Sequence, residues 1–251
     1  RYYLYDKGIV PHKEPFQKLV HQGMILGANG IKMGKRFPEF IVDPNEIVFK
    51  YGADTLRLYE MFMGPLEASK PWSEQGVEGA KRWLDRVWRL AMESDKITDQ
   101  ETPELNMVYN FTIKKVSEDI DTLNFNTAIS QMMIFINDCY KADKVNKDMM
   151  IDFIKLLSPY APHMCEEMYQ HYTGEETIAY ASWPTYDEKA LVQEEVTIVV
   201  QVNGKVRGRF DVAVGTDEDT LKEEAKKIEN VQRQVEGKTI RKVIVIKGKV
   251  S

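Results

Sequence analysis

The sequence predicts a mostly α-helical chain that ends in a small α+β domain. Between residues 73 and 184, apolar residues recur at spacings of three and four, which is typical of amphipathic helices that pack into a bundle. After residue 193, two runs of β-branched residues flank Asn203-Gly204, a strong short-range signal for a β-hairpin. The 251 residues suffice for one large or two modest domains.

Composition excludes several classes of protein. With 43% hydrophobic and 29% charged residues, the chain can bury a core and is not a disordered tail. A net charge of -5 excludes a uniformly basic nucleic-acid coat, although a local patch decides nucleic-acid binding. Cys139 and Cys165 have no CxxC partner, which excludes a four-cysteine zinc site and favours reduced thiols in a cytoplasmic protein. No apolar run approaches the roughly 20 residues that span a bilayer.

Residues 1–72 contain Gly-rich turns and short apolar runs. The segment 24–33 predicts a hairpin, because Asn29-Gly30 supplies the positive φ angles that a tight turn needs. Asp43-Pro44 predicts a helix start, and the helical pattern continues until Gly64-Pro65. The chain opens at Arg1 without a Met, so we expect it to be part of something longer.

Residues 73–192 read as helical. Ser73 predicts the cap of a long helix, and the simplest architecture is an antiparallel bundle. Further helices are expected over 104–119, 126–141, 147–158 and 162–171.

Residues 193–251 read as a compact ββαβ domain. Strands are expected over 196–202, 206–214 and 243–246, and a charged helix is expected over 216–227.

The sharpest local motif is Lys32-Met33-Gly34-Lys35-Arg36, which follows the first predicted hairpin. Three cations in five residues, with a Gly that lets the backbone approach closely, suit a phosphate ligand. By itself, the pentapeptide is also what a solvated basic turn looks like.

The surroundings of this motif resemble bacterial-type leucyl-tRNA synthetases, which are class I aminoacyl-tRNA synthetases with a KMSKS signature. The resemblance covers essentially the whole chain, in order, through segments 14–19, 23–27, 51–65, 72–74, 84–88, 157–163, 183–184 and 200–208. It implies that residues 1–72 end a catalytic domain with a KMSKS-type loop, and that 73–192 form a bundle of the anticodon-binding type. Residues 193–251 would then be the domain that contacts the outer corner of tRNA.

The resemblance also implies roles for individual residues. Lys32, Met33 and Lys35 correspond to the loop that closes on ATP with its Mg²⁺ ion. Lys32 and Lys35 are the catalytic candidates, since the second lysine stabilises charge as leucine attacks the α-phosphate. Gly34 and Arg36 stand where the signature usually has serines, and 37–42 is bulkier than expected, so we expect altered ATP-dependent closure.

Basic residues gather at the C-terminal end and on one helix face. From Lys226 to Ser251, eight lysine and arginine side chains stand against two glutamates. Such a face suits backbone phosphates, and the resemblance strengthens that interpretation. The predicted tRNA-binding residues are Arg82, Arg86, Lys205, Arg207, Arg209, Arg241, Lys242 and Lys247, with weaker support for Arg89 and Lys114-Lys115.

The function implied is the C-terminal portion of a leucine–tRNA ligase. The whole enzyme would bind leucine, ATP and leucine tRNA, and would act as a cytoplasmic monomer without a membrane partner. No HIGH-like histidine motif is present, and the nucleotide-binding units and the tRNA-editing domain would precede Arg1. We therefore expect this chain to be inactive alone, with no metal site of its own.

Three alternatives stay open. The first is a free-standing RNA-binding module without catalysis, against which the ATP-type loop argues. The second is the equivalent region of a valyl or isoleucyl enzyme, although these tend to end in a coiled coil or a Cys-rich zinc module. The third is a helical scaffold with a β cap and no RNA role, which predicts no salt-dependent tRNA binding.

Overall fold

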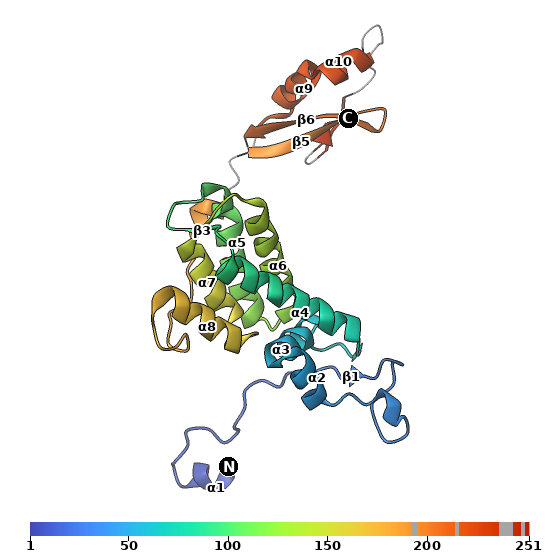
Figure 1. The fold of residues 1–251 in the computed structure, drawn as a ribbon. Coiled ribbons are helices and arrows are strands. Elements are labelled where there is room, and N and C mark those ends of the chain that lie inside the picture. The colour runs from blue at the N-terminus through green and yellow to red at the C-terminus, as the bar shows by residue number, and fades with distance from the viewer. Residues whose placement is uncertain (192–194, 214–215, 236–242, 247–248, 251) are drawn as a thin grey trace. The chain divides into compact units, whose positions relative to one another are not determined.

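A computed structural model describes residues 1–191, 195–213, 216–235, 243–246 and 249–250 (Figure 1). It separates into two compact units, Arg1–Asp187 and Glu188–Ser251, which are described in turn. The mostly helical fold class with small sheets is confirmed. The finer division into 1–72, 73–192 and 193–251 stays a prediction.

The first part of unit one carries short elements around a Gly-rich loop. The predicted hairpin over 24–33 is reduced to a single antiparallel bridge between Leu26 and Lys32. The strand before the turn pairs in parallel with a distant segment instead, Ile25 with Lys70 and Leu26 with Pro71. These elements are α1 (Tyr2–Asp6), β1 (Ile25–Leu26), η1 (Pro38–Phe40), α2 (Pro44–Tyr51), α3 (Ala53–Phe62) and β2 (Lys70–Pro71).

The helix that was predicted from Asp43 to Gly64 is two helices. It starts as expected, because the Asp43 side chain accepts a hydrogen bond from the backbone N–H of Asn45 and Pro44 occupies the first turn. Gly52 then adopts φ +91°, a conformation that favours glycine, and ends α2 before α3 begins. This break turns α3 toward the helical bundle.

The bundle follows the predicted helices closely. The Ser73 side chain caps α4 by accepting from the backbone N–H of Gly76, and α4 ends in a π-helical turn at Arg89–Glu93. Figure 1 shows α4 to α8 as one helical body. Its elements are α4 (Glu74–Trp88), β3 (Ile97–Thr98), η3 (Pro103–Leu105), α5 (Asn106–Asp121), α6 (Phe125–Lys141), β4 (Val145–Asn146), α7 (Lys147–Leu157) and α8 (Pro162–Thr173).

One hydrophobic core holds unit one together. Phe135 of α6 and Phe153 of α7 are stacked in it with 5.4 Å between ring centroids, and both side chains are buried. Leu58 and Tyr59 of α3 belong to the same core, so the segment that follows the signature motif packs into the bundle.

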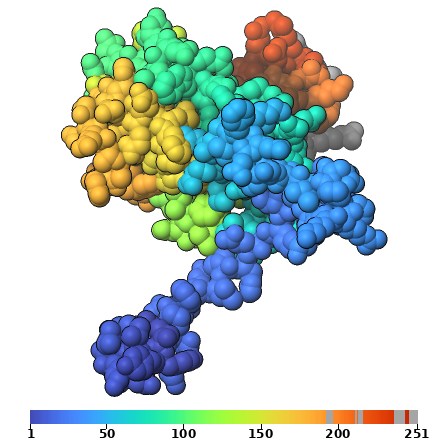
Figure 2. Space-filling view, turned by 60° about the horizontal axis from the view of Figure 1, so that its bottom comes forward, coloured from blue at the N-terminus to red at the C-terminus, as the bar shows by residue number. Residues whose placement is uncertain are grey.

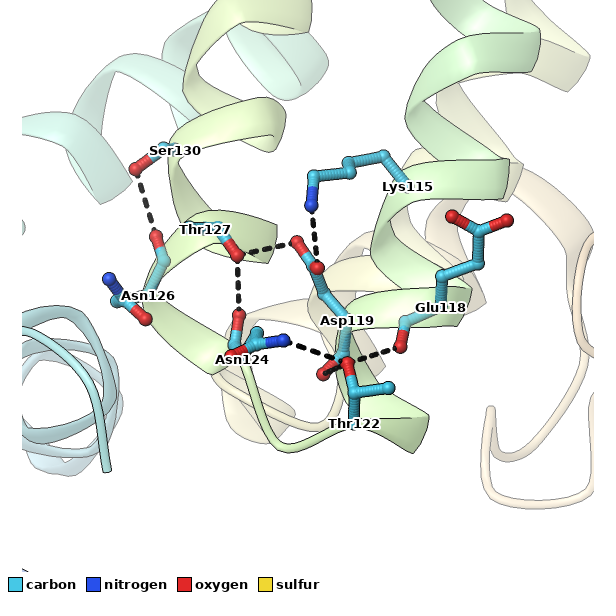
Figure 3. A network of polar contacts seen from close by, with 8 residues as sticks. All are labelled: Lys115, Glu118, Asp119, Thr122, Asn124, Asn126, Thr127 and Ser130. Carbon is cyan, nitrogen blue, oxygen red and sulfur yellow. Dashed lines mark hydrogen bonds and ion pairs between the residues drawn. The ribbon is translucent and has the colours of Figure 1, made fainter. Parts of the chain in front are cut away.

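A polar network fixes the turn between α5 and α6 (Figure 3). The buried carboxylate of Asp119 accepts from Lys115 Nζ at 2.6 Å and from the Thr127 hydroxyl at 2.7 Å. Leu123 has φ +62°, and the backbone N–H of Asn124 donates to the Asp119 carbonyl at 2.7 Å. The turn is therefore held by side-chain and backbone contacts together.

Two glycines of α4 give a matched test of packing. A Cβ on Gly76 would lie 2.5 Å from Tyr59 Cε2, whereas a Cβ on Gly79 would meet only Arg82 Nη2 at 3.9 Å. We expect Gly76→Ala to lower the free energy of unfolding by about 1–3 kcal/mol through overpacking. Gly79→Ala is expected to raise it by about 0.5–1 kcal/mol, because Ala is the better helix former.

Urea unfolding followed by tryptophan fluorescence measures this pair, since all four tryptophans lie in unit one. Shifts of the midpoint in the same direction for both variants would contradict the close contact between Gly76 and Tyr59.

Unit two is a small α+β domain. Asn203 and Gly204, with φ +52° and +77°, form the predicted turn between β5 (Glu195–Val202) and β6 (Lys205–Ala213). Ile198 and Val200 pack with residues of α9 and α10, which cover one face of the sheet (Figure 1). The structure adds a second helix and a second short strand to the predicted order. Its further elements are η4 (Glu188–Leu191), α9 (Glu218–Lys227), α10 (Glu229–Val235), β7 (Val245–Ile246) and β8 (Lys249–Val250), and the sheet order is β6-β5-β8-β7.

Candidate functional site

The signature loop, residues 32–36, follows the Leu26–Lys32 bridge in unit one. Its backbone turns back on itself where the N–H of Phe37 donates to the Gly34 carbonyl at 3.0 Å. The side chains of Lys32, Lys35 and Arg36 are exposed, and Met33 is half-buried. The turn thus presents cations to solvent and keeps its methionine toward the protein.

The two lysines of the loop carry charge that none of the described protein groups neutralises. In the part of the chain that the structure describes, neither the Lys32 nor the Lys35 ammonium has an ion pair or a hydrogen bond. The Arg36 guanidinium lies over the ring of Phe37, 5.4 Å from its centroid. Free ammonium groups on a turn can follow the oxygens of a polyphosphate, so the geometry fits the chemistry expected of Lys32 and Lys35.

The segment that precedes the loop packs closely against other parts of unit one. A Cβ on Gly27 would lie 2.9 Å from the Cβ of Phe40, and a Cβ on Gly23 would lie 2.1 Å from the Ala68 carbonyl oxygen. Only glycine fits at both positions. The Gly27 contact brings the segments before and after the loop together, and the Gly23 contact joins the segment before the loop to residues 68–69.

A second group of cations lies on α4 beside a hollow of about 500 Å³, which we call the arginine hollow. Arg86 places its guanidinium 4.8 Å from the centre of the Tyr140 ring and donates to Asn137 Oδ1 at 3.0 Å. Arg89 is exposed and donates to the Asp85 carbonyl at 3.3 Å. The arginine hollow is lined by Arg86, Arg89, Glu93, Ser94 and Tyr140.

The basic side chains of the bundle differ in whether a carboxylate already pairs with them. Among the described residues, no carboxylate forms an ion pair with Arg86 or Arg89, whereas Arg82 lies 3.9 Å from Glu78. Lys115 is bound to the buried Asp119, and Lys114 lies over the Tyr186 ring at 5.5 Å. The arginine hollow is therefore better suited to an external anion than the other predicted positions of the bundle. The contribution of Tyr140 has no local sequence signal, because it lies 54 residues from Arg86.

In the hairpin of unit two, Lys205, Arg207 and Arg209 do not all lie on one face of β6, as they would in a regular strand. The register shifts between Val200 and Gln201, which leaves Arg207 as the extra residue of a β-bulge. Lys205 stands opposite Val202 and Arg209 opposite Val199, so the bulge separates residues that strict alternation would place on one face. The Nε atom of Arg207 is buried and has no hydrogen-bond partner in the described structure, and Arg209 is exposed.

The basic C-terminal end is described only in part. Arg241, Lys242 and Lys247 lie outside the described residues. Of the described cations, Lys227 pairs with Glu224 at 2.6 Å and Arg233 pairs with Glu229.

We also considered a reactive cysteine, a metal site and a membrane-spanning helix. Burial raises the pKa of the Cys139 thiol to about 12 and that of Cys165 well above its usual value, so both thiols are protonated at neutral pH. Over the described ranges, no group of three His, Cys, Asp or Glu side chains is placed to hold a metal ion. None of the helices described here is long and apolar enough to cross a bilayer.

Comparison with known proteins identifies the family. Residues 9–73, which include the signature loop, match the family "tRNA synthetases class I (I, L, M and V)". Residues 104–223 match the "anticodon-binding domain of tRNA ligase". The chain belongs to the class I tRNA synthetases. This confirms that the signature motif and its surroundings are those of a class I aminoacyl-tRNA synthetase.

A solved structure gives a similar picture for the class I synthetase fold. The chain matches a LeuRS of Agrobacterium radiobacter K84, agnB2, from a crystal structure of its ternary complex with tRNA and LeuAMS. The match has a TM-score of 0.73 and 25% sequence identity, and it covers 99% of this chain. The chain spans 35% of the length of that synthetase chain.

Proposed function

We propose that this chain is part of a leucyl-tRNA synthetase, in which it supplies the ATP-signature loop and a tRNA-binding surface. The whole enzyme would activate leucine with ATP and Mg²⁺ and transfer it to leucine tRNA in the cytoplasm. The observation that carries the proposal is the pair of loop lysines, Lys32 and Lys35, which have no partner among the described residues. The segment that follows the loop shares one core with a helical bundle that matches the anticodon-binding family. The leucine specificity is supported by the similarity to the LeuRS structure.

In this proposal the loop lysines and the arginines serve different parts of the ligands. Lys32 and Lys35, with Met33, would contact ATP. Arg86 and Arg89 would contact tRNA phosphates from the arginine hollow, with Arg82 beside them. In unit two, Lys205, Arg207 and Arg209 would act with Arg241, Lys242 and Lys247 on the corner of the tRNA.

Competition between tRNAs tests the proposed specificity. The 251-residue chain is incubated with labelled leucine tRNA and is challenged with unlabelled leucine tRNA or with a tRNA for another amino acid. We expect the leucine tRNA to compete better. Equal competition would favour the first alternative, a free-standing RNA-binding module without catalysis.

A single charge in the arginine hollow should be visible in the same assay. Arg89→Gln is expected to weaken tRNA binding and to reduce the salt slope of the affinity by about 1, because one phosphate contact is lost. Lys141→Gln is the matched control, since Lys141 is exposed but already pairs with Asp138 at 2.7 Å. Equal effects of the two variants would show that only net charge matters.

A further inference from the structure

Helix α3 joins the two features on which the proposed function depends. It follows the signature loop in the chain, and its side chains reach the turn between α7 and α8 in the bundle. In Figure 2 the blue residues around α3 lie against the yellow residues around α8, and these two helices are in contact.

Asp54 of α3 caps a helix that lies far away in the sequence. Its Oδ2 atom accepts from the backbone N–H of Met164 at 2.8 Å, and its Oδ1 atom accepts from the backbone N–H of His163 at 3.3 Å. The His163 ring adds a contact from Nδ1 to Oδ1 at 2.7 Å. The residue that precedes α8, Ala161, provides no side-chain cap of its own. One carboxylate, 13% exposed, therefore replaces the local cap of α8.

Arg57 binds the other end of the same turn. Its Nη2 atom donates to the Pro159 carbonyl at 2.8 Å. Asp54 and Arg57 are three positions apart on α3, so they lie on one face of the helix. From that face, both side chains form hydrogen bonds with residues 158–163.

The C-terminal half of α3 is connected to the signature loop through side-chain and backbone contacts. The Tyr59 hydroxyl accepts from the backbone N–H of Ser73 at 2.9 Å, and its ring meets the edge of Trp72 at 5.0 Å. The backbone N–H of Trp72 donates to the Leu26 carbonyl at 2.8 Å, and Leu26 bridges Lys32. A continuous set of contacts thus runs from the α8 cap to the first residue of the signature loop.

Packing alone does not fill the junction at the Asp54 end of α3. A hollow of about 450 Å³ lies there, between the start of α3, α4 and the start of α8. Lys81, Asp85 and Trp88 of α4 line it, together with Asp54 and His163. At this end of α3, the polar contacts of Asp54 and Arg57 therefore add to the burial of Thr55 and Leu58.

We propose that Asp54 and Arg57 are positioning residues, which clamp α3 to residues 158–163 and hold the signature loop at a fixed distance from the bundle. The proposal rests on the proposed function, because a fixed distance matters to a protein that uses the loop and the tRNA surface together. Neither residue needs to touch ATP or RNA. A loop displaced by about 1 Å would slow catalysis by as much as about 100-fold.

Distance measurement between two spin labels tests the clamp in the 251-residue chain. The labels are placed on Gly34→Cys in the loop and Met107→Cys on α5. A Cβ on Gly34 meets no atom within 4 Å, and Met107 is 46% exposed. The native Cys139 and Cys165 are buried, so they do not compete for the label.

We expect one narrow distance distribution in the unsubstituted chain, and its loss in Asp54→Ala and in Arg57→Leu. Asp54→Asn keeps an oxygen that accepts from the α8 backbone, so it should restore most of the narrow distribution. Glu46→Ala removes an exposed carboxylate of α2 and should change nothing. Should Asp54→Ala fail to fold, Arg57→Leu and Asp54→Asn carry the test. Distributions that stay narrow in the clamp variants overturn the proposal.

tRNA binding by the same samples separates the two proposals. The clamp variants are expected to keep the tRNA affinity of the unsubstituted chain. In a protein that also contains the nucleotide-binding domain, they should lower kcat of aminoacylation by about 10- to 100-fold without changing KM for tRNA. A rise in KM with unchanged kcat would contradict the positioning role. Absence of tRNA binding by the unsubstituted chain would contradict the proposed function, while the distance distributions would still decide the clamp.

Discussion

Lys35→Ala is expected to lower leucine-dependent exchange of pyrophosphate into ATP by about 100- to 1,000-fold, in a protein that carries this chain together with a nucleotide-binding domain. The Lys35 side chain is exposed and has no partner among the described residues, so its whole charge is available to the triphosphate. A cation held over developing negative charge lowers the barrier, and its removal leaves that charge to water. Because the Lys35 side chain forms no hydrogen bond or ion pair with the described residues, its removal should not change the melting temperature.

Two variants make the Lys35 experiment specific. Lys50→Ala removes the same charge from α2, but Lys50 already pairs with Glu74 at 2.7 Å, so the exchange rate should stay near that of the unsubstituted protein. Lys35→Arg keeps a charge without the compact ammonium and should fall between the two. Equal rates for Lys35→Ala and Lys50→Ala would remove Lys35 from the ATP site.

Asp119→Ala is expected to lower the free energy of unfolding of unit one by about 3 kcal/mol. Asp119 is 3% exposed, and it accepts charge-assisted or hydroxyl hydrogen bonds from both helices of the α5–α6 turn (Figure 3). The substitution leaves a cavity and removes the partner of Lys115. Unfolding in urea, followed by tryptophan fluorescence, measures the loss.

The neighbouring Asp121 provides the control for this prediction. It lies on the same helix and is exposed, so Asp121→Ala should change the free energy of unfolding by no more than about 0.5 kcal/mol. Thr127→Val removes one of the two contacts and should lose about 1 kcal/mol. A loss in Asp119→Ala no larger than that in Asp121→Ala would contradict the role of the network.

Local signals in the sequence predicted most of the secondary structure correctly. Asp43, Ser73 and Asp217 each cap the helix that follows them, and Asn203-Gly204 forms the hairpin turn. These features depend on residues within a few positions of one another, so their physics is visible in a short window. The break at Gly52 was not predicted, because a single glycine within a helical pattern does not reveal the positive φ that the structure shows.

Long-range contacts were not predictable from the sequence. The parallel pairing of β1 with β2, the Arg86–Tyr140 contact and the capping of α8 by Asp54 all join residues far apart in the chain. Nor does the sequence mark the bulge at Arg207, which changes the faces on which Lys205 and Arg209 lie. The candidate cations were therefore found by type and spacing, whereas their availability to a ligand required the structure.

Binding of leucine tRNA to the 251-residue chain at increasing salt concentration tests the central claim most directly. A surface that neutralises several phosphates predicts a linear fall of the logarithm of the affinity against the logarithm of salt concentration. For six to ten phosphate contacts, the fall between about 50 and 200 mM salt is roughly a thousandfold or more. A steep slope that decreases in Arg89→Gln is the predicted result. A flat response, or no binding at low salt, would contradict the account.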